Sequence, residues 1–268
     1  MKNVESIINC LRWAYEKSPF YRRFYDEIGF SIDDYTDAKA ITKLPLLAIE
    51  KFSTVPFFNL ITLPLSAIAE TCAIEYRDGN FIIARSAHET SASIKQTIDY
   101  LSYTGINRAS VVALDEFSPI VNRELADSLS AINANILYLS EDLSFSAKIE
   151  LIRYFGADTL IATRSAIDKY VRFLDNQSAD TLFRVIMISS DFPKKNDTVA
   201  VNYEESLKTP VYEIISLPWT SSLIDLYKTD NGDFITRKTL LITRDNDGFV
   251  VTDTAAMTIP LINVKVKR

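Results

Sequence analysis

Polar side chains that could bind a ligand follow three apolar runs in the second half of the chain. In order along the sequence they are Thr163, Arg164, Ser165, Ser189, Ser190, Asp191, Ser216 and Trp219. If the runs are parallel strands, their carboxyl ends meet at one edge of a sheet, which is where open α/β sheets bind ligands. Arg164 could then pair with a carboxylate or a phosphate through two parallel hydrogen bonds. A surface salt bridge of Arg164 is the alternative.

His88 is the only histidine of the sequence, and it stands in a stretch rich in Ser and Thr. A histidine can act as a general base near neutral pH. No nucleophile accompanies it at a recognisable spacing, so we expect His88 to be exposed or to cap a helix. A thiol site built from Cys72, His88 and Asp115 is a further alternative. It is disfavoured because a cysteine in an apolar strand usually belongs to the core.

Aspartates are frequent in the last part of the chain. They are Asp225, Asp230, Asp233, Asp245, Asp247 and Asp253. Their spacing lacks the alternating ligands and closing glutamate of a calcium loop. Aspartate is common in turns because its side chain bonds to the nearby backbone. We therefore expect turns here, and neither a metal site nor a cofactor.

The composition excludes several classes of protein. The chain has 268 residues, an average content of apolar and charged residues, and a net charge of −6, which disfavours a nucleic-acid binder. It has 6 glycines, where about 19 would be average at roughly 7%. Phosphate-binding loops need glycine because backbone N–H groups must approach the anion closely. No such loop is visible in the sequence.

The two cysteines, Cys10 and Cys72, are far apart in the sequence and belong to no metal or redox motif. This spacing suits a reducing compartment, and we expect both thiols to lie in the core. The N-terminal stretch lacks the unbroken apolar run of a signal peptide, and no window reaches the length of a membrane span. We expect a cytoplasmic protein.

Apolar runs that favour strands alternate with amphipathic segments that favour helices, which predicts an α/β fold with a parallel sheet and crossover helices. The expected strands are 81–84, 109–114, 134–139, 158–163, 183–189 and 210–216. The expected helices are 91–105, 119–132, 144–156, 164–176 and 196–208. A hairpin is expected at 73–86, where two alternating runs flank Asp78-Gly79.

Three segments follow from this pattern. Residues 1–70 form a helical and irregular N-terminal wrap, 71–216 form the α/β core, and 217–268 form a β-rich part. In the last segment, loops at 230–233 and 245–248 separate alternating runs, which predicts an antiparallel meander.

The stretch 11–47, LRWAYEKSPFYRRFYDEIGFSIDDYTDAKAITKLPLL, combines a helix, a Ser-Pro-Phe-Tyr-Arg turn and a second helix ending in Gly-Phe. It resembles the opening of the phenylacetate–coenzyme A ligase family of adenylate-forming enzymes. Stretches 91–114, 147–174, 183–193 and 239–268 resemble later units of the family, in the family's order. The resemblance covers nearly the whole chain at low identity, and it implies the fold of the family's large domain.

The departures from this family concern its nucleotide site. Counted without a gap, the family's Ser-Ser-Gly-Thr-Thr-Gly phosphate loop falls on 73–78, which reads AIEYRD. The degenerate positions are Glu75, Tyr76, Arg77 and Asp78, of which the two carboxylates would repel a triphosphate. We interpret the stretch as a hairpin standing where the family has its ATP loop.

Two further motifs of the family are changed. Its adenine-binding Gly-Ala-Glu falls on Ser189, Ser190 and Asp191, and its magnesium-binding Tyr-Gly-x-Thr/Ser-Glu falls on ISLPW, 215–219. Trp219 could fill the vacated adenine space or belong to an exposed partner patch. The resemblance further implies that the ribose-binding aspartate and the small C-terminal domain with the catalytic lysine are absent.

These departures predict a catalytically degenerate relative that acts as a binding or scaffolding subunit. Its partner would be a carrier protein, an active ligase or a second copy of the chain, and a small acyl or aromatic carboxylate is a further candidate ligand. We expect neither nucleic acid nor membrane as a partner. The alternatives are an acyl-activating enzyme that uses a rewired pocket or a partner's lysine, and a small-molecule sensor.

Overall fold

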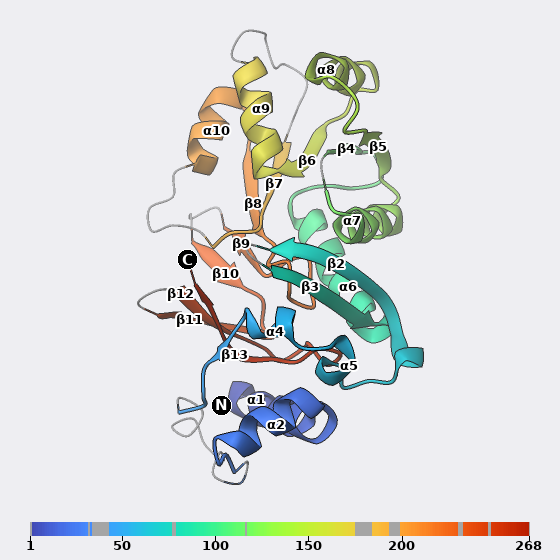
Figure 1. The fold of residues 1–268 in the computed structure, drawn as a ribbon. Helices are drawn as coiled ribbons and strands as arrows, with labels where there is room; N and C mark the ends of the chain where they lie inside the picture. Colours follow the sequence, from blue (N-terminus) through green and yellow to red (C-terminus); the bar gives the residue numbers. More distant parts are fainter. Residues whose placement is uncertain are drawn as a thin grey trace. The chain divides into compact units, whose positions relative to one another are not determined.

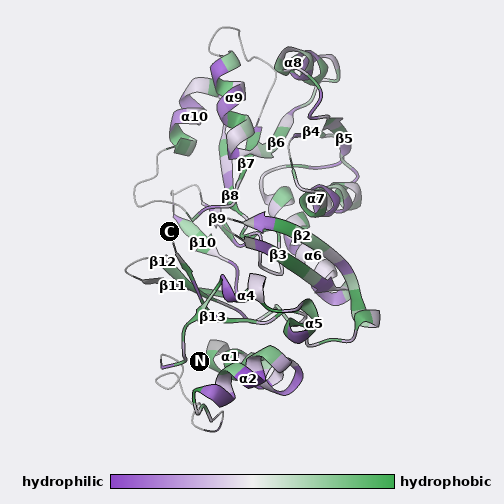
Figure 2. Ribbon diagram, in the orientation of Figure 1, coloured by the Kyte–Doolittle hydropathy of each residue, from purple (hydrophilic) through white to green (hydrophobic). Residues whose placement is uncertain are grey.

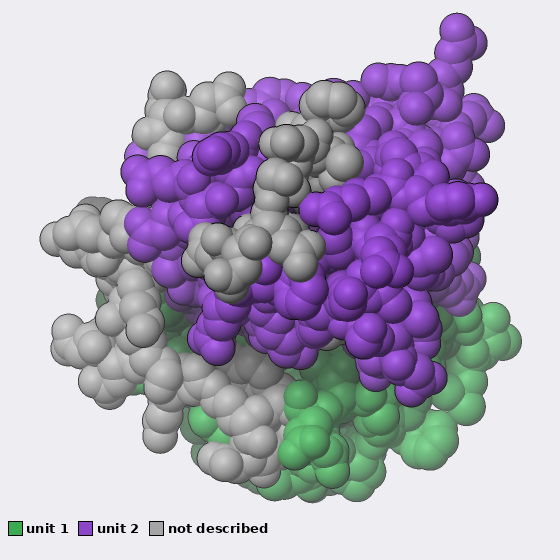
Figure 3. All heavy atoms as spheres, turned by 90° about the horizontal axis from the view of Figure 1, so that it is seen from above, with its two compact units in different colours: residues 1–91, 218–222, 236–268 green, residues 92–217, 223–235 purple. Residues whose placement is uncertain are grey.

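A computed structural model describes residues 2–31, 33, 43–76, 79–115, 117–174, 184–192, 199–229, 233–245 and 248–267. The chain divides into two compact units (Figure 3). Unit 1 comprises Met1–Ser91, Pro218–Ser222 and Thr236–Arg268, and unit 2 comprises Ala92–Leu217 and Leu223–Ile235. The contacts thus group the first expected segment, 1–70, with most of the last one, 217–268, whereas residues 223–235 of the last segment belong to unit 2.

Unit 2 is built on a sheet in which, among the described residues, seven strands lie in the order β10-β9-β8-β7-β6-β4-β5 (Figure 1). Strands β4 to β8 run parallel, as the alternation of the sequence predicts, and β9 is antiparallel to β8. Their bounds are Val111–Asp115, Asn135–Leu139, Thr159–Thr163, Arg184–Ser189 and Val211–Ile215 for β4 to β8, and Leu226–Lys228 and Phe234–Thr236 for β9 and β10.

Helices cover both faces of this sheet. Strand β5 lies on one side of β4, and β6 to β8 follow on the other side. Because crossover connections are right-handed, this change of direction places α6 and α7 on one face of the sheet and α8 to α10 on the other. The helices are α6 Ala87–Tyr103, α7 Pro119–Ile132, α8 Phe145–Tyr154, α9 Arg164–Leu174 and α10 Val199–Leu207. In Figure 2 these helices carry both hydrophobic and hydrophilic residues, as expected of helices with one buried face.

Two apolar clusters form the core of unit 2, one on each face of the sheet. Strand β4 contributes Ala113 to the cluster that contains α8 to α10, and Val112 and Leu114 to the cluster that contains α6 and α7. Neighbouring residues of a strand point to opposite faces. A strand buried on both faces therefore reads as a continuous apolar run, which is the pattern that predicted β4 and β6 to β8.

Unit 1 contains a second sheet, of four strands within the described part of the chain, in the order β1-β13-β12-β11. The hairpin of β2 and β3 pairs separately. The strands are β1 Leu47–Ala48, β2 Ile68–Tyr76, β3 Gly79–Ser86, β11 Leu240–Asp245, β12 Gly248–Asp253 and β13 Leu261–Lys267. The helices are α1 Lys2–Lys17, α2 Pro19–Glu27, α4 Lys51–Thr54, α5 Phe57–Leu60 and the 3₁₀ turn Leu65–Ala67.

The N-terminal helices are tied to this sheet by buried polar atoms. Ser18 caps α2, and the first residue of that helix is proline, which fits the first turn because it has no N–H to satisfy. Tyr21 is completely buried, and its hydroxyl donates to the carbonyl of Pro260 at 2.6 Å. The helices that the sequence predicts as an N-terminal wrap are therefore anchored beside β13.

Two expectations about strands are corrected. Residues 81–84 belong to β3, which pairs antiparallel with β2 and is not part of the parallel sheet. Tyr76 of β2 pairs with Gly79 of β3, so β3 pairs with the strand that directly precedes it in the sequence. The expected C-terminal meander is divided, because β9 and β10 extend the sheet of unit 2 whereas β11 to β13 form the sheet of unit 1.

Within the described ranges, no helix is both long enough and apolar enough to span a bilayer.

Candidate functional site

The carboxyl edge of the parallel sheet in unit 2 carries most of the expected pocket residues. Thr163 ends β6, Ser189 ends β7 and Ser216 follows β8. The strands end in step, because Thr163 pairs with Ile188, and Ser189 with Ile215. The expected convergence of these residues on one edge is present in the structure. That this edge binds a ligand stays a prediction.

The hydroxyl groups at this edge bond to nearby groups of the chain. Thr163 Oγ1 lies 3.0 Å from Ser165 Oγ and accepts a hydrogen bond from the backbone N–H three residues later at 3.2 Å. It therefore stabilises the first turn of α9. Ser189 Oγ accepts from the N–H of Asp191 at 3.4 Å, and Ser190 and Asp191 are exposed. The contacts explain how these residues shape the turns that follow the strands.

Arg164 is the first residue of α9, and it bonds to the neighbouring helix. Its side chain hydrogen-bonds to Tyr203 of α10, whose hydroxyl also donates to Asp168 of α9. Burial and the Asp168 hydrogen bond raise the pKa of Tyr203 to about 12, although Arg164 acts in the opposite direction. The phenol therefore stays neutral and joins α9 to α10. The contact with Tyr203 is a hydrogen bond to a neutral phenol, so a salt bridge of Arg164 and a ligand contact of Arg164 both stay predictions.

The stretch that the resemblance aligns with a phosphate loop forms a closed hairpin. Glu75 pairs with Asn80, and Tyr76 pairs with Gly79, so the strand pairing continues to the turn. Arg77 and Asp78 lie outside the described residues. The expected hairpin is confirmed.

His88 is exposed, as expected, and is the second residue of α6. The helix is capped by Ser86, which accepts from the N–H of Glu89 while Glu89 accepts from the N–H of Ser86. The alternative thiol site would need the carboxylate of Asp115. That carboxylate is completely buried and accepts hydrogen bonds from Lys148 and Tyr170, so it does not serve such a site.

The two cysteines differ in burial. Cys10 is buried in unit 1, and burial together with the nearby charge of Asp253 raises the pKa of its thiol to about 12, so the thiol is protonated and unreactive. Cys72 is only half-buried, which corrects the expectation of two core thiols. It lies on the hairpin β2, where exposed and half-buried residues alternate.

Two members of the acidic run are buried, although Asp253 also has the expected turn role, because its carboxylate accepts from the N–H of Ala255 two residues later. Asp225 and Asp253 are completely buried, and Asp225 accepts a hydrogen bond from the N–H of Leu217 at 2.7 Å. Asp230 and Asp247 lie outside the described residues. Within the described ranges, no group of three or more His, Cys, Asp or Glu side chains is arranged to hold a metal ion.

A small cavity of about 30 Å³ lies inside unit 1. It is lined mainly by apolar side chains, with one carboxylate and two hydroxyl residues among them. The lining residues are Ile49, Phe52, Leu60, Phe81, Ile82, Ile83, Ala84, Glu89, Trp219, Thr220, Ser221, Ala256, Ile259 and Leu261. Trp219 is the one expected site residue among them, and it is buried, which excludes an exposed patch around it. A cavity of this size holds one or two water molecules.

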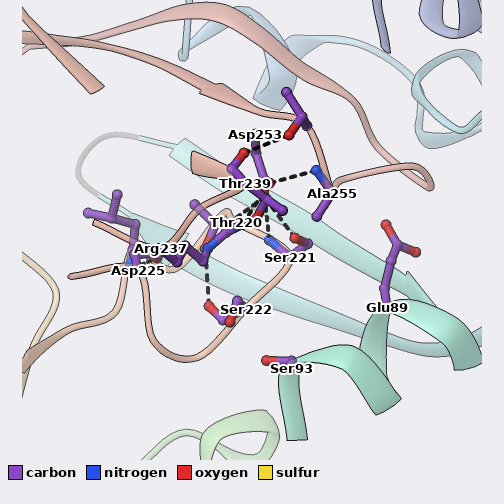
Figure 4. Close-up of polar contacts among 12 residues, drawn as sticks. Glu89, Ser93, Thr220, Ser221, Ser222, Asp225, Arg237, Thr239, Asp253 and Ala255 are labelled. Carbon is purple, nitrogen blue, oxygen red and sulfur yellow. Dashed lines mark hydrogen bonds and ion pairs between the residues drawn. The ribbon is translucent and has the colours of Figure 1, made fainter. Parts of the chain in front are cut away.

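A buried ion pair holds the segment that carries Trp219 (Figure 4). Arg237 donates two hydrogen bonds to Asp253, at 2.9 and 2.6 Å. Asp253 also accepts from the N–H and the hydroxyl of Ser221, at 3.1 and 2.7 Å, and from the N–H of Ala255 at 3.0 Å. Burial alone would raise the pKa of Asp253, but Arg237 and Ser221 outweigh it and lower that pKa. The carboxylate therefore stays ionised and fixes the backbone around it.

A second buried ion pair reaches the same segment. Arg85 lies 2.5 Å from Glu70, and its guanidinium donates to the carbonyl of Ser221 at 3.4 Å. Glu70 also accepts from the hydroxyl of Thr90 at 3.1 Å. Ser221 thus contacts a charged side chain through its N–H, its hydroxyl and its carbonyl.

Glu89 is the carboxylate of the cavity wall, and its oxygens accept hydrogen bonds from the chain itself. It accepts from the N–H of Met257 at 2.7 Å and from the N–H and hydroxyl of Thr258. Ser86 donates its N–H and its hydroxyl to the same carboxylate, both at 2.7 Å. Glu89 therefore links the start of α6 to the 257–258 turn.

The sequence reasoning missed Glu89, Arg237 and Asp253 as organising residues. For Glu89 a signal was present, because Ser86-x-x-Glu89 has the spacing of a capping box. Arg237 and Asp253 are 16 residues apart and meet only through the folding of a sheet. No local pattern marks such a pair.

No protein-family model matches the sequence, and no similar sequence was found among curated proteins. The fold, in contrast, is shared with solved acyl-CoA ligases. A 2-hydroxyisobutyryl-CoA ligase in an open conformation superposes with a TM-score of 0.81 at 14% identity, over 98% of this chain and 67% of the ligase. The same ligase in its thioesterification state gives 0.79 at 15% identity, over 98% of this chain and 61% of the ligase.

A more distant neighbour is the O-succinylbenzoate coenzyme A synthetase of Bacillus subtilis bound to AMP, with a TM-score of 0.53 at 10% identity. The match covers 72% of this chain and 42% of the synthetase. The chain therefore has the α/β fold of adenylate-forming enzymes and spans about two thirds or less of the length of these ligases. At such identities the similarity establishes the fold alone.

Proposed function

We propose that this chain is a binding or scaffolding subunit with the fold of an adenylate-forming ligase, and that it does not activate an acid with ATP by itself. The observation that carries the proposal is the register of the β2–β3 hairpin, in which Tyr76 pairs with Gly79. The two strands are joined by two residues only, at the place where the resemblance puts the phosphate loop.

A loop that grips phosphates presents several backbone N–H groups to the anion. In this chain the residues from Ala73 to Tyr76 belong to β2 and are paired across the hairpin. Glu75 and Asp78 add negative charge where a triphosphate would lie. Catalysis of phosphoryl chemistry depends mostly on such preorganised donors, and the loss of one donor can cost two or three orders of magnitude in rate. The hairpin therefore supports the loss of ATP chemistry.

The position aligned with the family's magnesium-binding glutamate supports the same conclusion. In the motif-based alignment this position is Trp219, whose indole is buried in the wall of an apolar cavity. An indole cannot provide the oxygen ligand that Mg²⁺ requires.

The partner that we propose is a protein, such as a carrier protein, an active ligase or a second copy of the chain. The cavity of unit 1, at about 30 Å³, is too small for an acyl chain or an aromatic acid. A partner would then be recognised by the surface of the chain.

Calorimetric titration with ATP and AMP, combined with pyrophosphate exchange over a panel of aromatic and aliphatic acids, tests the proposal. We expect neither binding of nucleotide nor exchange by the isolated chain. A 2-hydroxyisobutyryl-CoA ligase assayed in parallel is the positive control. Exchange above the no-enzyme background would overturn the proposal and establish the rival function, an acyl-activating enzyme with a rewired pocket.

A further inference from the structure

One wall of the cavity in unit 1 is formed by the short segment Pro218–Ser222. This segment supplies Trp219, Thr220 and Ser221. The other walls come from β3, from Ile49 with α4 and α5, from Glu89 of α6, and from the 256–261 stretch. Of the lining residues, Ile82 is the most exposed, at 41% of its surface, and every other one except Ile259 is buried. The cavity is therefore a mainly apolar space between buried side chains, and it is partly open.

Trp219 is the largest side chain that lines this space, and it is buried. Its side chain is 7% exposed, and beside it the remaining cavity measures about 30 Å³. A buried tryptophan side chain buries about 150–250 Å² of surface. It is therefore much larger than the one or two water molecules that the remaining cavity can hold. We propose that unit 1 contains a latent binding site for a planar aromatic molecule of indole size, and that the side chain of Trp219 is the internal ligand that fills it.

The two buried ion pairs explain how the indole is kept in place. Ser221, two residues after Trp219, bonds to Asp253 through its N–H and its hydroxyl, and its carbonyl accepts from Arg85. The hydrogen bonds of Ser221 hold the backbone two residues after Trp219, so a movement of the indole that shifts this backbone is opposed. Such a movement would separate Ser221 from both ion pairs, each of which would remain buried without one of its hydrogen-bond partners.

The inference deepens the proposed function and rests on it in one respect. If the chain has no small-molecule substrate, a pocket filled by its own side chain carries no functional penalty. The latent site then represents a binding pocket that is closed permanently, and recognition takes place on the surface of the chain.

The test is the variant Trp219→Ala with indole as the probe, followed by thermal unfolding and calorimetry. Removal of the side chain opens a cavity lined by the apolar residues above, and such cavities bind apolar molecules of matching size. We expect the unfolding midpoint of the variant to lie below that of the wild type. Indole at a hundredfold excess over its Kd should raise that midpoint by about 5 °C or more. The wild type should not respond to indole.

Trp13→Ala is the matched control. Trp13 is a half-buried tryptophan of unit 1 whose Nε1 donates to Thr62 and Met257, and it is not part of the cavity lining. Its removal should lower the midpoint without creating an indole response.

Two results would overturn the inference. One is saturable binding of indole by the wild type with the affinity of the variant, because the site would then be open. The other is a folded Trp219→Ala protein that binds no indole. If Trp219→Ala does not fold, Trp219→Leu with benzene as the probe takes its place, with the same two readings. Neither result depends on nucleotide binding, so the failure of this inference is distinct from a failure of the proposed function.

Discussion

Asp253 in unit 1 and Asp115 in unit 2 are both completely buried beside a cation, but they hold different kinds of group. Asp253 accepts hydrogen bonds from Arg237 and from backbone N–H groups of Ser221 and Ala255. Asp115 accepts from two side chains, Lys148 at 2.6 Å and Tyr170 at 2.7 Å. The first carboxylate fixes the path of the chain, whereas the second ties helices to a strand.

This difference predicts which of the two hydrogen-bond networks could be replaced by apolar residues. A buried ion pair seldom adds stability beyond that of apolar residues of the same size, because the charges must be desolvated. A network that consists only of side chains can therefore be replaced as a whole by apolar residues of similar size. A carboxylate that satisfies buried N–H groups cannot, because those donors remain after the exchange and each costs about 1–3 kcal/mol when unpaired.

The largest effect is expected from Arg237→Met. The substitution removes the cation that pairs with Asp253, whose charge stays buried beside the remaining hydrogen-bond donors. We expect the free energy of unfolding to fall by about 3–5 kcal/mol. Urea unfolding measures the loss. Arg123→Met is the control, because Arg123 and Asp127 form an exposed pair at 3.8 Å whose loss should cost less than about 0.5 kcal/mol. A similar loss in both variants would contradict the special role of Asp253.

Lys148→Met should cost about 3 kcal/mol for the same reason. The double variant Lys148→Met with Asp115→Asn sharpens the comparison between the units. The amide of Asn removes the buried charge, and its oxygen still accepts a hydrogen bond from Tyr170. We expect the double variant to regain most of the lost stability. The corresponding pair, Arg237→Met with Asp253→Asn, should regain less, because an amide has one acceptor oxygen for the donors that Asp253 serves. Equal recovery in the two units would refute the distinction.

The lowered pKa of Asp253 predicts a smaller effect, which is a loss of folding stability in acid. Burial opposes the shift, and Arg237 and Ser221 outweigh it. The folded protein therefore binds this proton less tightly than the unfolded chain, whose aspartates have a pKa of about 3.9. The stabilisation is complete above that value and is lost as the pH falls through the lower pKa of the folded state.

Urea unfolding of the wild type and of Asp253→Asn between pH 6 and pH 3 measures this contribution. The variant should be the less stable protein at pH 6, and its stability should fall less steeply with acid. Parallel curves would show that other carboxylates cause the acid sensitivity.

The elements of unit 2 could be predicted from the sequence because their signals are local. The apolar periodicity and the proline at the first turn give α7 its bounds, Pro119–Ile132, and the apolar runs give the parallel strands. The division of the C-terminal strands between two sheets could not be predicted in this way. The loops at 230–233 and 245–248 both predict hairpins. Only contacts between residues that are distant in the sequence decide which sheet each hairpin joins.

The candidate site was less predictable for the same reason. The carboxyl edge of the sheet follows from topology, which predicts that Thr163, Ser189 and Ser216 lie there but not that Trp219 lines a cavity of unit 1. The contacts that hold Ser221 come from Asp253, 32 residues later, and from Arg85, 136 residues earlier. Asp253 belongs to an acidic run whose other members flank the loops at 230–233 and 245–248, so a buried role for Asp253 had no local signal.

The smallest effects concern helix caps, and they extend the comparison to exposed positions. Ser144 caps α8 in unit 2 through the N–H of Ala147 and is exposed, so Ser144→Ala should cost about 0.5–1 kcal/mol. Ser18 caps α2 in unit 1, is completely buried and also donates to the carbonyl of Asn59 at 2.8 Å. Ser18→Ala leaves that carbonyl and the cap unsatisfied, and it should cost about 2 kcal/mol. The difference between the two variants in urea unfolding measures what burial adds to the same cap, and equal losses would show that it adds nothing.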